Sequence, residues 1–144
     1  MQAEVNQRNA ELLEDEVLAP LRGEDLSEVE FYVACKLLKE ASQERPFSGE
    51  GLRLAITMRF PDEQANIDDR EVKDIVRRLR KRCSFPILSS RKRGESGYWW
   101  CQSKDEMLGF IERFQKQPLD ELHTLHEMVR RHFPELSGQL RLIE

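Results

Sequence analysis

Basic side chains gather in one short segment of an otherwise acidic chain. The segment from Arg70 to Arg93 contains ten lysines or arginines and only two acids, Glu71 and Asp74, so its formal charge is +8. The whole chain carries −4, which leaves −12 for everything outside this segment. Cations concentrated in this way form an anion-binding surface, and the anion that such clusters most often bind is a nucleic-acid backbone. The segment therefore predicts a contact with nucleic acid.

The other reactive residue types form no recognisable catalytic set. The three cysteines lack CxxC spacing, which favours reduced thiols over a disulfide framework or a zinc site. His123 and His126 share a helix face with Glu127, but no fourth metal ligand is evident, so solvated side chains are the simpler interpretation. The chain has no phosphate-binding glycine loop, HExxH or GxSxG motif. We predict no enzymatic activity, no metal and no cofactor.

Composition indicates a folded, highly charged protein. Apolar residues make up 39% of the chain and charged residues 35%, a balance that does not indicate bulk disorder. No apolar run reaches the roughly 18 residues that a membrane span needs, and the N-terminus lacks a secretion signal. We expect a cytoplasmic protein without membrane contact.

The basic segment opens with the clearest amphipathic pattern in the chain. Apolar residues at Val72, Ile75, Val76 and Leu79 predict a helix from Asp69 to about Arg82, capped by Asp68 or Asp69. The opposite face carries five basic residues: Arg70, Lys73, Arg77, Arg80 and Lys81. On the flank, Asp74 and Arg78 are four residues apart and can form an ion pair.

A β-hairpin is expected after this helix. Residues 85–90 predict one strand, residues 91–97 a basic loop with two glycines, and residues 98–101 a second strand. Neighbouring strand residues point to opposite faces, so we expect one of Trp99 and Trp100 in the core and the other half-exposed. Stacking on nucleic-acid bases is the alternative role for these aromatic rings.

Helices are predicted on the N-terminal side of the basic segment. Residues 1 to 24 form an acidic arm, either a short helix that ends before Pro20 or a mobile segment. Ser27 followed by Glu30 is a capping box, which predicts a helix to about Gln43.

A turn from Pro46 to Gly49 leads to a short helix from Gly51 to Phe60, and a polar connector follows. The residues of that helix expected to be buried are Leu52, Ala55, Ile56 and Met58.

Two further helices are predicted after the hairpin. Ser103 and Glu106 open one that ends near Gln117, Pro118 starts the next, and Pro134 ends it. The tail after Pro134 is ambiguous. Four apolar residues line the last helix at steps of three and four: Leu122, Leu125, Val129 and Phe133.

The order of these elements resembles the winged-helix family of DNA-binding domains. The likeness is carried by residues 67–80, 86–90 and 97–99. It implies a mainly α fold with a small β-hairpin: an N-terminal arm (1–24), a winged-helix domain (25–102) and a C-terminal helical extension (103–144). The whole is also similar to winged-helix proteins encoded by phages and prophages.

The resemblance implies that the helix from Asp69 to Arg82 enters the major groove of double-stranded DNA. The implied function is that of a regulator or a phage or plasmid replication accessory. The expected DNA-binding residues are Asn66, Arg70, Lys73, Arg77, Arg80 and Lys81 on or before the helix, Ser89 and Ser90 on the first strand, and Arg91, Lys92 and Arg93 in the wing. The chain departs from the family in its long connector without glycine and in Asp68 and Asp69, whose charges would repel phosphates.

Three alternatives remain open from sequence. The apolar row of the last helix either packs on the rest of the chain or forms a homodimer, which we favour because DNA-binding proteins often dimerise. Winged helices also serve as protein–protein interaction adaptors, and the acidic remainder of the chain fits that role. The acidic arm is either solvated or covers the basic helix when DNA is absent.

Overall fold

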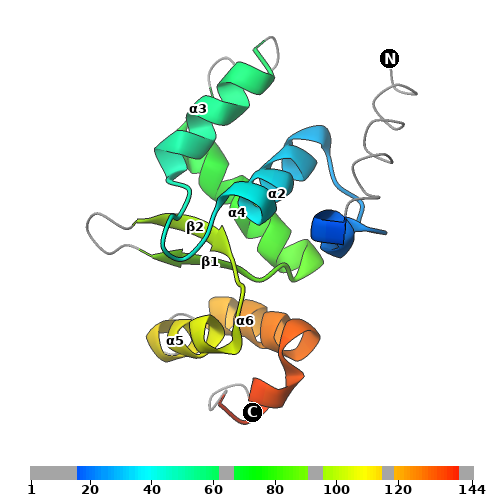
Figure 1. The fold of residues 1–144 in the computed structure, drawn as a ribbon, viewed down its shortest axis with the longest axis vertical. Coiled ribbons are helices and arrows are strands. Elements are labelled where there is room, and N and C mark those ends of the chain that lie inside the picture. Colours follow the sequence, from blue (N-terminus) through cyan, green and yellow to red (C-terminus); the bar gives the residue numbers. More distant parts are fainter. Residues whose placement is uncertain (1–15, 62–66, 91–95, 115–118, 140–144) are drawn as a thin grey trace.

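The protein is described by a computed structural model that covers residues 16–61, 67–90, 96–114 and 119–139. The described chain is mainly helical with one small antiparallel hairpin, which confirms the predicted class at that level. The elements are η1 (Glu16–Leu21), α2 (Glu28–Glu40), α3 (Gly49–Arg59), α4 (Asp69–Cys83), β1 (Ile87–Ser90), β2 (Gly97–Trp100), α5 (Lys104–Phe114), α6 (Leu119–His132) and η2 (Pro134–Gln139). The hairpin lies between α2, α3 and α4 on one side and α5 and α6 on the other (Figure 1).

Local capping signals set where the helices begin. At the start of α2, the Ser27 amide donates to Glu30 Oε1 at 2.9 Å and the Glu30 amide donates to Ser27 Oγ at 3.1 Å, which confirms the predicted capping box. Asp68 is the cap of α4, and its carboxylate accepts a hydrogen bond of 2.9 Å from the Glu71 amide. The helix then ends at Cys83, where Ser84 adopts the left-handed conformation (φ 54°) that commonly closes helices.

The segment before α3 adds one further β-bridge, at Phe47, to the hairpin. The hairpin's own register pairs Ile87 with Trp100 and Ser90 with Gly97. Phe47 forms a bridge to Tyr98 on the other edge of β2, with hydrogen bonds of 2.8 and 2.9 Å between the two backbones. The connection between α2 and α3, which the sequence predicts only as a turn, is therefore fastened to the hairpin.

Both tryptophans of β2 belong to the core. Trp99 is 1% exposed and Trp100 is 6% exposed, so the prediction that one of them is half-exposed is wrong. Trp99 Nε1 donates to Glu106 Oε1 on α5 at 2.8 Å, and the Trp100 ring lies 4.9 Å from that of Phe85. Both faces of the strand are buried because helices lie on both sides of the hairpin (Figure 1).

The apolar row of α6 packs inside the chain. Leu122, Leu125 and Val129 are buried, and Phe133 packs against the same core. This is the first of the two alternatives that the sequence leaves open. The homodimer predicted through that row gains no support, because the row is already covered. The core also runs across residue 102, where the sequence places a domain boundary.

Two smaller predictions also need correction. Leu18 and Leu21 are buried in the core and Pro20 lies inside η1, so the end of the N-terminal arm is part of the fold. Met58 is 81% exposed, because α3 buries the face that holds Leu52 and Ile56 instead. Within the described residues, no helix combines the length and apolar composition that crossing a membrane requires.

Candidate nucleic-acid interface

The basic residues of α4 divide into three groups by their surroundings. Four are exposed and recur at steps of three, four and four, which places them on one face of the helix. We call this group the α4 stripe: Arg70, Lys73, Arg77 and Lys81. The stripe faces away from the buried side of α4, which is formed by Val72, Ile75, Val76 and Leu79.

Most of the stripe is free to meet a ligand. Among the residues that the structure describes, Arg70, Lys73 and Arg77 have no ion pair or hydrogen bond that would neutralise them. Their charges are therefore available to an external anion. This availability favours a nucleic-acid contact, since each cation that neutralises a phosphate releases counterions from the duplex.

Arg80 departs from the prediction that placed it with these residues. Its Nε donates to the Ile87 carbonyl oxygen at 2.7 Å, and its guanidinium carbon lies 5.8 Å from the centre of the Tyr98 ring. Burial lowers the pKa of the Arg80 guanidinium to about 10, so it stays charged at neutral pH. Solvent does not reach its Nη2 atom. Arg80 anchors the hairpin to α4 and is not on the exposed face.

The third group consists of Arg78 and Arg82, which meet a carboxylate on another helix. Arg78 Nε lies 3.2 Å and Arg82 Nη1 lies 3.6 Å from the same oxygen, Oε2 of Glu30. Glu30 is buried, with a side chain only 6% exposed. The sequence predicts Asp74 as the partner of Arg78, and the observed hydrogen bond goes to α2 instead.

Glu30 carries its charge in the folded protein. Burial by itself raises the pKa of the Glu30 carboxyl, but the hydrogen bonds from the Ser27 amide and from Arg78 outweigh it, so the pKa lies below its usual value of 4.5. The sequence identifies Glu30 only as a capping residue, because its arginine partners lie far away in the chain. The one available signal was the repeat of Arg78 and Arg82 at helical spacing.

The remaining predicted DNA-binding residues divide between half-buried positions and undescribed ones. Ser89 and Ser90 are half-buried on β1. Asn66, Arg91, Lys92 and Arg93 lie outside the described residues. The predicted cationic surface is therefore seen along α4, and its continuation into the wing stays a prediction.

Catalytic or metal-binding chemistry gains no support from the other reactive groups. The described residues contain no group of three or more histidines, cysteines or acids that could hold a metal ion. Burial raises the pKa of the Cys35, Cys83 and Cys101 thiols to about 11, so they are protonated and poor nucleophiles at neutral pH.

Comparison with known proteins adds nothing to the geometry. No family model, curated protein or solved structure matches this chain. Function is therefore inferred from the residues themselves.

Proposed function

We propose that the protein binds double-stranded DNA through the α4 stripe and has no enzymatic activity. The observation that carries the proposal is the row of exposed cations along α4, of which Arg70, Lys73 and Arg77 have no partner among the described residues. Within a chain of net charge −4, such a row attracts a polyanion.

The surroundings of α4 support a winged-helix mode of binding. The element order α2, α3, α4, β1, β2 is the order that the resemblance implies. Arg80 connects the hairpin to α4, and the β-bridge between Phe47 and Tyr98 connects the α2–α3 segment to the hairpin. The three helices and the hairpin thus hold one another in a fixed arrangement, which a DNA-reading helix needs.

The dimensions of α4 suit a major groove. Its 15 residues correspond to a length of about 22 Å at 1.5 Å per residue, and the groove of B-DNA, about 12 Å wide, admits an α-helix. In this mode the N-terminal Arg70 and Lys73 meet base edges, while Arg77 and Lys81 contact phosphates further along. An acid at this position has a structural role, because the Asp68 carboxylate caps α4 by accepting the hydrogen bond of the Glu71 amide.

The direct test measures duplex binding as a function of salt. If six of the ten cations between Arg70 and Arg93 contact phosphate, the slope of log K against log[salt] is about −5. The triple variant R70A/K73A/R77A removes two base-edge contacts and the Arg77 phosphate contact, so it should weaken binding and lower the magnitude of the slope by about 0.9, the value for one phosphate. A slope that does not change in this variant would refute the proposal.

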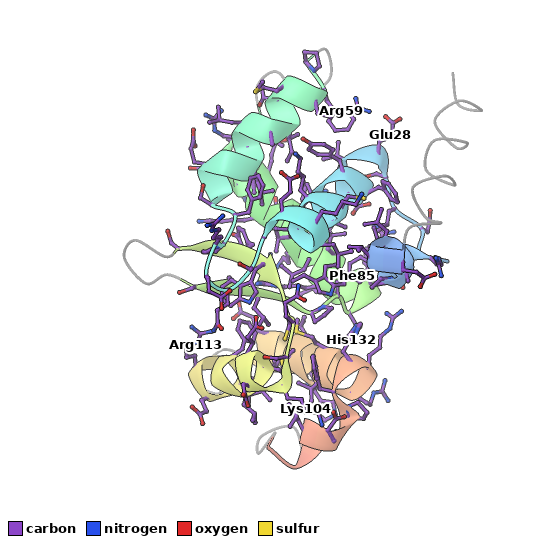
Figure 2. The ribbon with its side chains drawn as sticks, viewed as in Figure 1. Glu28, Arg59, Phe85, Lys104, Arg113 and His132 are labelled. Carbon is purple, nitrogen blue, oxygen red and sulfur yellow. The ribbon has the colours of Figure 1, made fainter. Side chains whose placement is uncertain are left out.

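A matched control changes the same number of charges elsewhere. The variant K104A/R113A/R130A removes three exposed cations from α5 and α6. Lys104 and Arg113 lie on α5, across the hairpin from α2 and α3 (Figure 2). This control should retain the wild-type slope, which separates a local interface from an effect of net charge.

The biological role that we propose is regulation of transcription or an accessory role in phage or plasmid replication. Selection from random oligonucleotides by the purified protein tests it. An enriched sequence would indicate a regulator with a defined site. Binding without enrichment would point to the accessory role.

A protein–protein interaction adaptor on the same scaffold is the second candidate. The observation in its favour is a pair of exposed apolar residues one turn apart on α3, Leu54 at 48% and Met58 at 81% exposure. Absence of duplex binding at low salt would favour this adaptor role over the DNA-binding role.

A further inference from the structure

A buried carboxylate connects α2 to the flank of α4, beside the α4 stripe. One oxygen of Glu30, Oε1, accepts the hydrogen bond of the Ser27 amide that completes the cap of α2. The other oxygen, Oε2, is shared by Arg78 and Arg82. Glu30 therefore completes the N-terminal cap of α2 and also binds two arginines of α4.

Arg78 and Arg82 contact Glu30 but keep hydrogen-bond donors that take no part in this contact. Their side chains remain 50% and 56% exposed, and Arg78 uses only its Nε for the hydrogen bond to Glu30. A guanidinium has five N–H donors, so both groups keep donors that can reach outward. Two arginines and one carboxylate leave the cluster with a net charge of +1.

The cluster has a defined position relative to the stripe. At 100° per residue, Arg78 and Arg82 lie on α4 between the stripe and the buried face, on the side that meets α2. A helix seated in a major groove has base edges beneath it and a row of phosphates along each wall. The flank of α4 is the part of the helix that approaches such a wall.

We propose that Arg78 and Arg82 form a second phosphate-binding row along α4, and that Glu30 is the positioning residue that fixes their guanidinium groups for it. The inference rests on the proposed DNA binding and names the groups that contact one strand of the duplex backbone. A planar guanidinium held through one edge can offer the other edge to a phosphate, a geometry that a freely rotating side chain reaches only at an entropic cost.

For the substitution Glu30→Gln, the positioning role and simple electrostatics predict opposite changes in DNA affinity. Glutamine also occurs at this position of a capping box, so it can still accept from the Ser27 amide and preserve the start of α2. The neutral glutamine side chain cannot form an ion pair with Arg78 or Arg82. Removal of a negative charge should by itself tighten DNA binding, whereas loss of positioning should weaken it.

We expect E30Q to bind a mixed-sequence duplex about fivefold to tenfold more weakly at about 100 mM salt, and to lower the magnitude of the salt slope by about 1. The control is E28Q, which removes one exposed acid two residues earlier on the same helix. It should bind as tightly as wild type or slightly more tightly, with an unchanged slope. Equal behaviour of E30Q and E28Q would overturn the proposal.

A second variant covers the case in which E30Q loses stability. R78A/R82A replaces two half-exposed residues and should lower the magnitude of the slope by about 2. The slope is informative because a reduced folded fraction scales the affinity at every salt concentration and leaves the slope nearly unchanged. An unchanged slope in R78A/R82A would refute the second row.

The outcomes also separate this inference from the proposed function. If R70A/K73A/R77A loses slope while R78A/R82A and E30Q do not, DNA binding stands and the second row is wrong. If the wild-type protein binds no duplex between about 50 and 200 mM salt, both proposals are wrong.

Discussion

At the scale of single residues, the bridge between Phe47 and Tyr98 depends on a glycine. Gly97 has a φ of +152°, and a Cβ there would lie 2.8 Å from the Phe47 carbonyl oxygen. G97A should push the two backbones apart and destabilise the fold by about 1–3 kcal/mol, measured by urea denaturation. In contrast, a Cβ at Gly109 in α5 meets nothing within 4 Å, so G109A should stabilise the fold by about 0.5–1 kcal/mol. Equal effects of the two substitutions would contradict this account.

Half-buried His132 leads to a prediction about how stability depends on pH. Burial and the neighbouring Arg131 charge lower the pKa of His132 below its usual 6.5, although a hydrogen bond with the Ser84 backbone opposes this. The unfolded chain takes up a proton near pH 6.5, whereas the folded protein resists it until a lower pH. The free energy of unfolding should therefore fall as the pH drops below about 6.5.

Urea denaturation at several pH values measures this dependence. H132Q should flatten it, and H123Q, which alters an exposed histidine, should leave it in place. If the pH dependence of the free energy of unfolding persists unchanged in H132Q, another titratable group causes it.

Local signals were predictable at this scale and distant ones were not. The caps at Ser27 and Asp68 are confirmed because each depends on a residue three positions away. The contact of Glu30 with Arg78 joins residues 48 apart in sequence. No pattern in a single sequence identifies such a partner, so the sequence predicted the neighbouring Asp74 instead.

At the scale of elements, the difference between Arg80 and Arg77 can be tested on one helix. Arg80 donates to the Ile87 backbone and faces the Tyr98 ring, whereas Arg77 is exposed. R77M should lower the magnitude of the salt slope for duplex binding by about 1. R80M removes the same charge but should leave the slope close to that of wild type. If both variants lower it equally, the hairpin contact of Arg80 does not hold in the DNA complex.

Elements were predicted where their own sequence determines them. α4 follows the predicted bounds closely because its apolar and basic faces are sharply divided. The hairpin was also predicted, but the burial of both tryptophans was not. That burial arises because α5 and α6 cover the second face of the hairpin. The sequence of a four-residue strand does not reveal which distant helices pack against it.

At the scale of the whole molecule, one core crosses the boundary predicted at residue 102. Met107, Phe110 and Val129 from α5 and α6 lie in the same cluster as Leu37 and Leu79 from α2 and α4. Arg131 adds polar contacts, donating to the Cys83 carbonyl at the end of α4 and to Glu24 at 2.7 Å. Elements that share a core and these contacts are expected to unfold together.

Truncation tests this unity. A fragment of residues 1–102 loses the Glu106 partner of Trp99 and the helices that cover one face of the hairpin. We expect it to show a broad, non-cooperative thermal transition and to bind a hydrophobic dye, as loosely packed states do. The full chain should instead unfold in one step, with circular dichroism and tryptophan fluorescence giving the same midpoint. A fragment that unfolds as sharply as the full chain would show that α5 and α6 are a separate domain, and it would then be the smallest unit in which to measure DNA binding by α4.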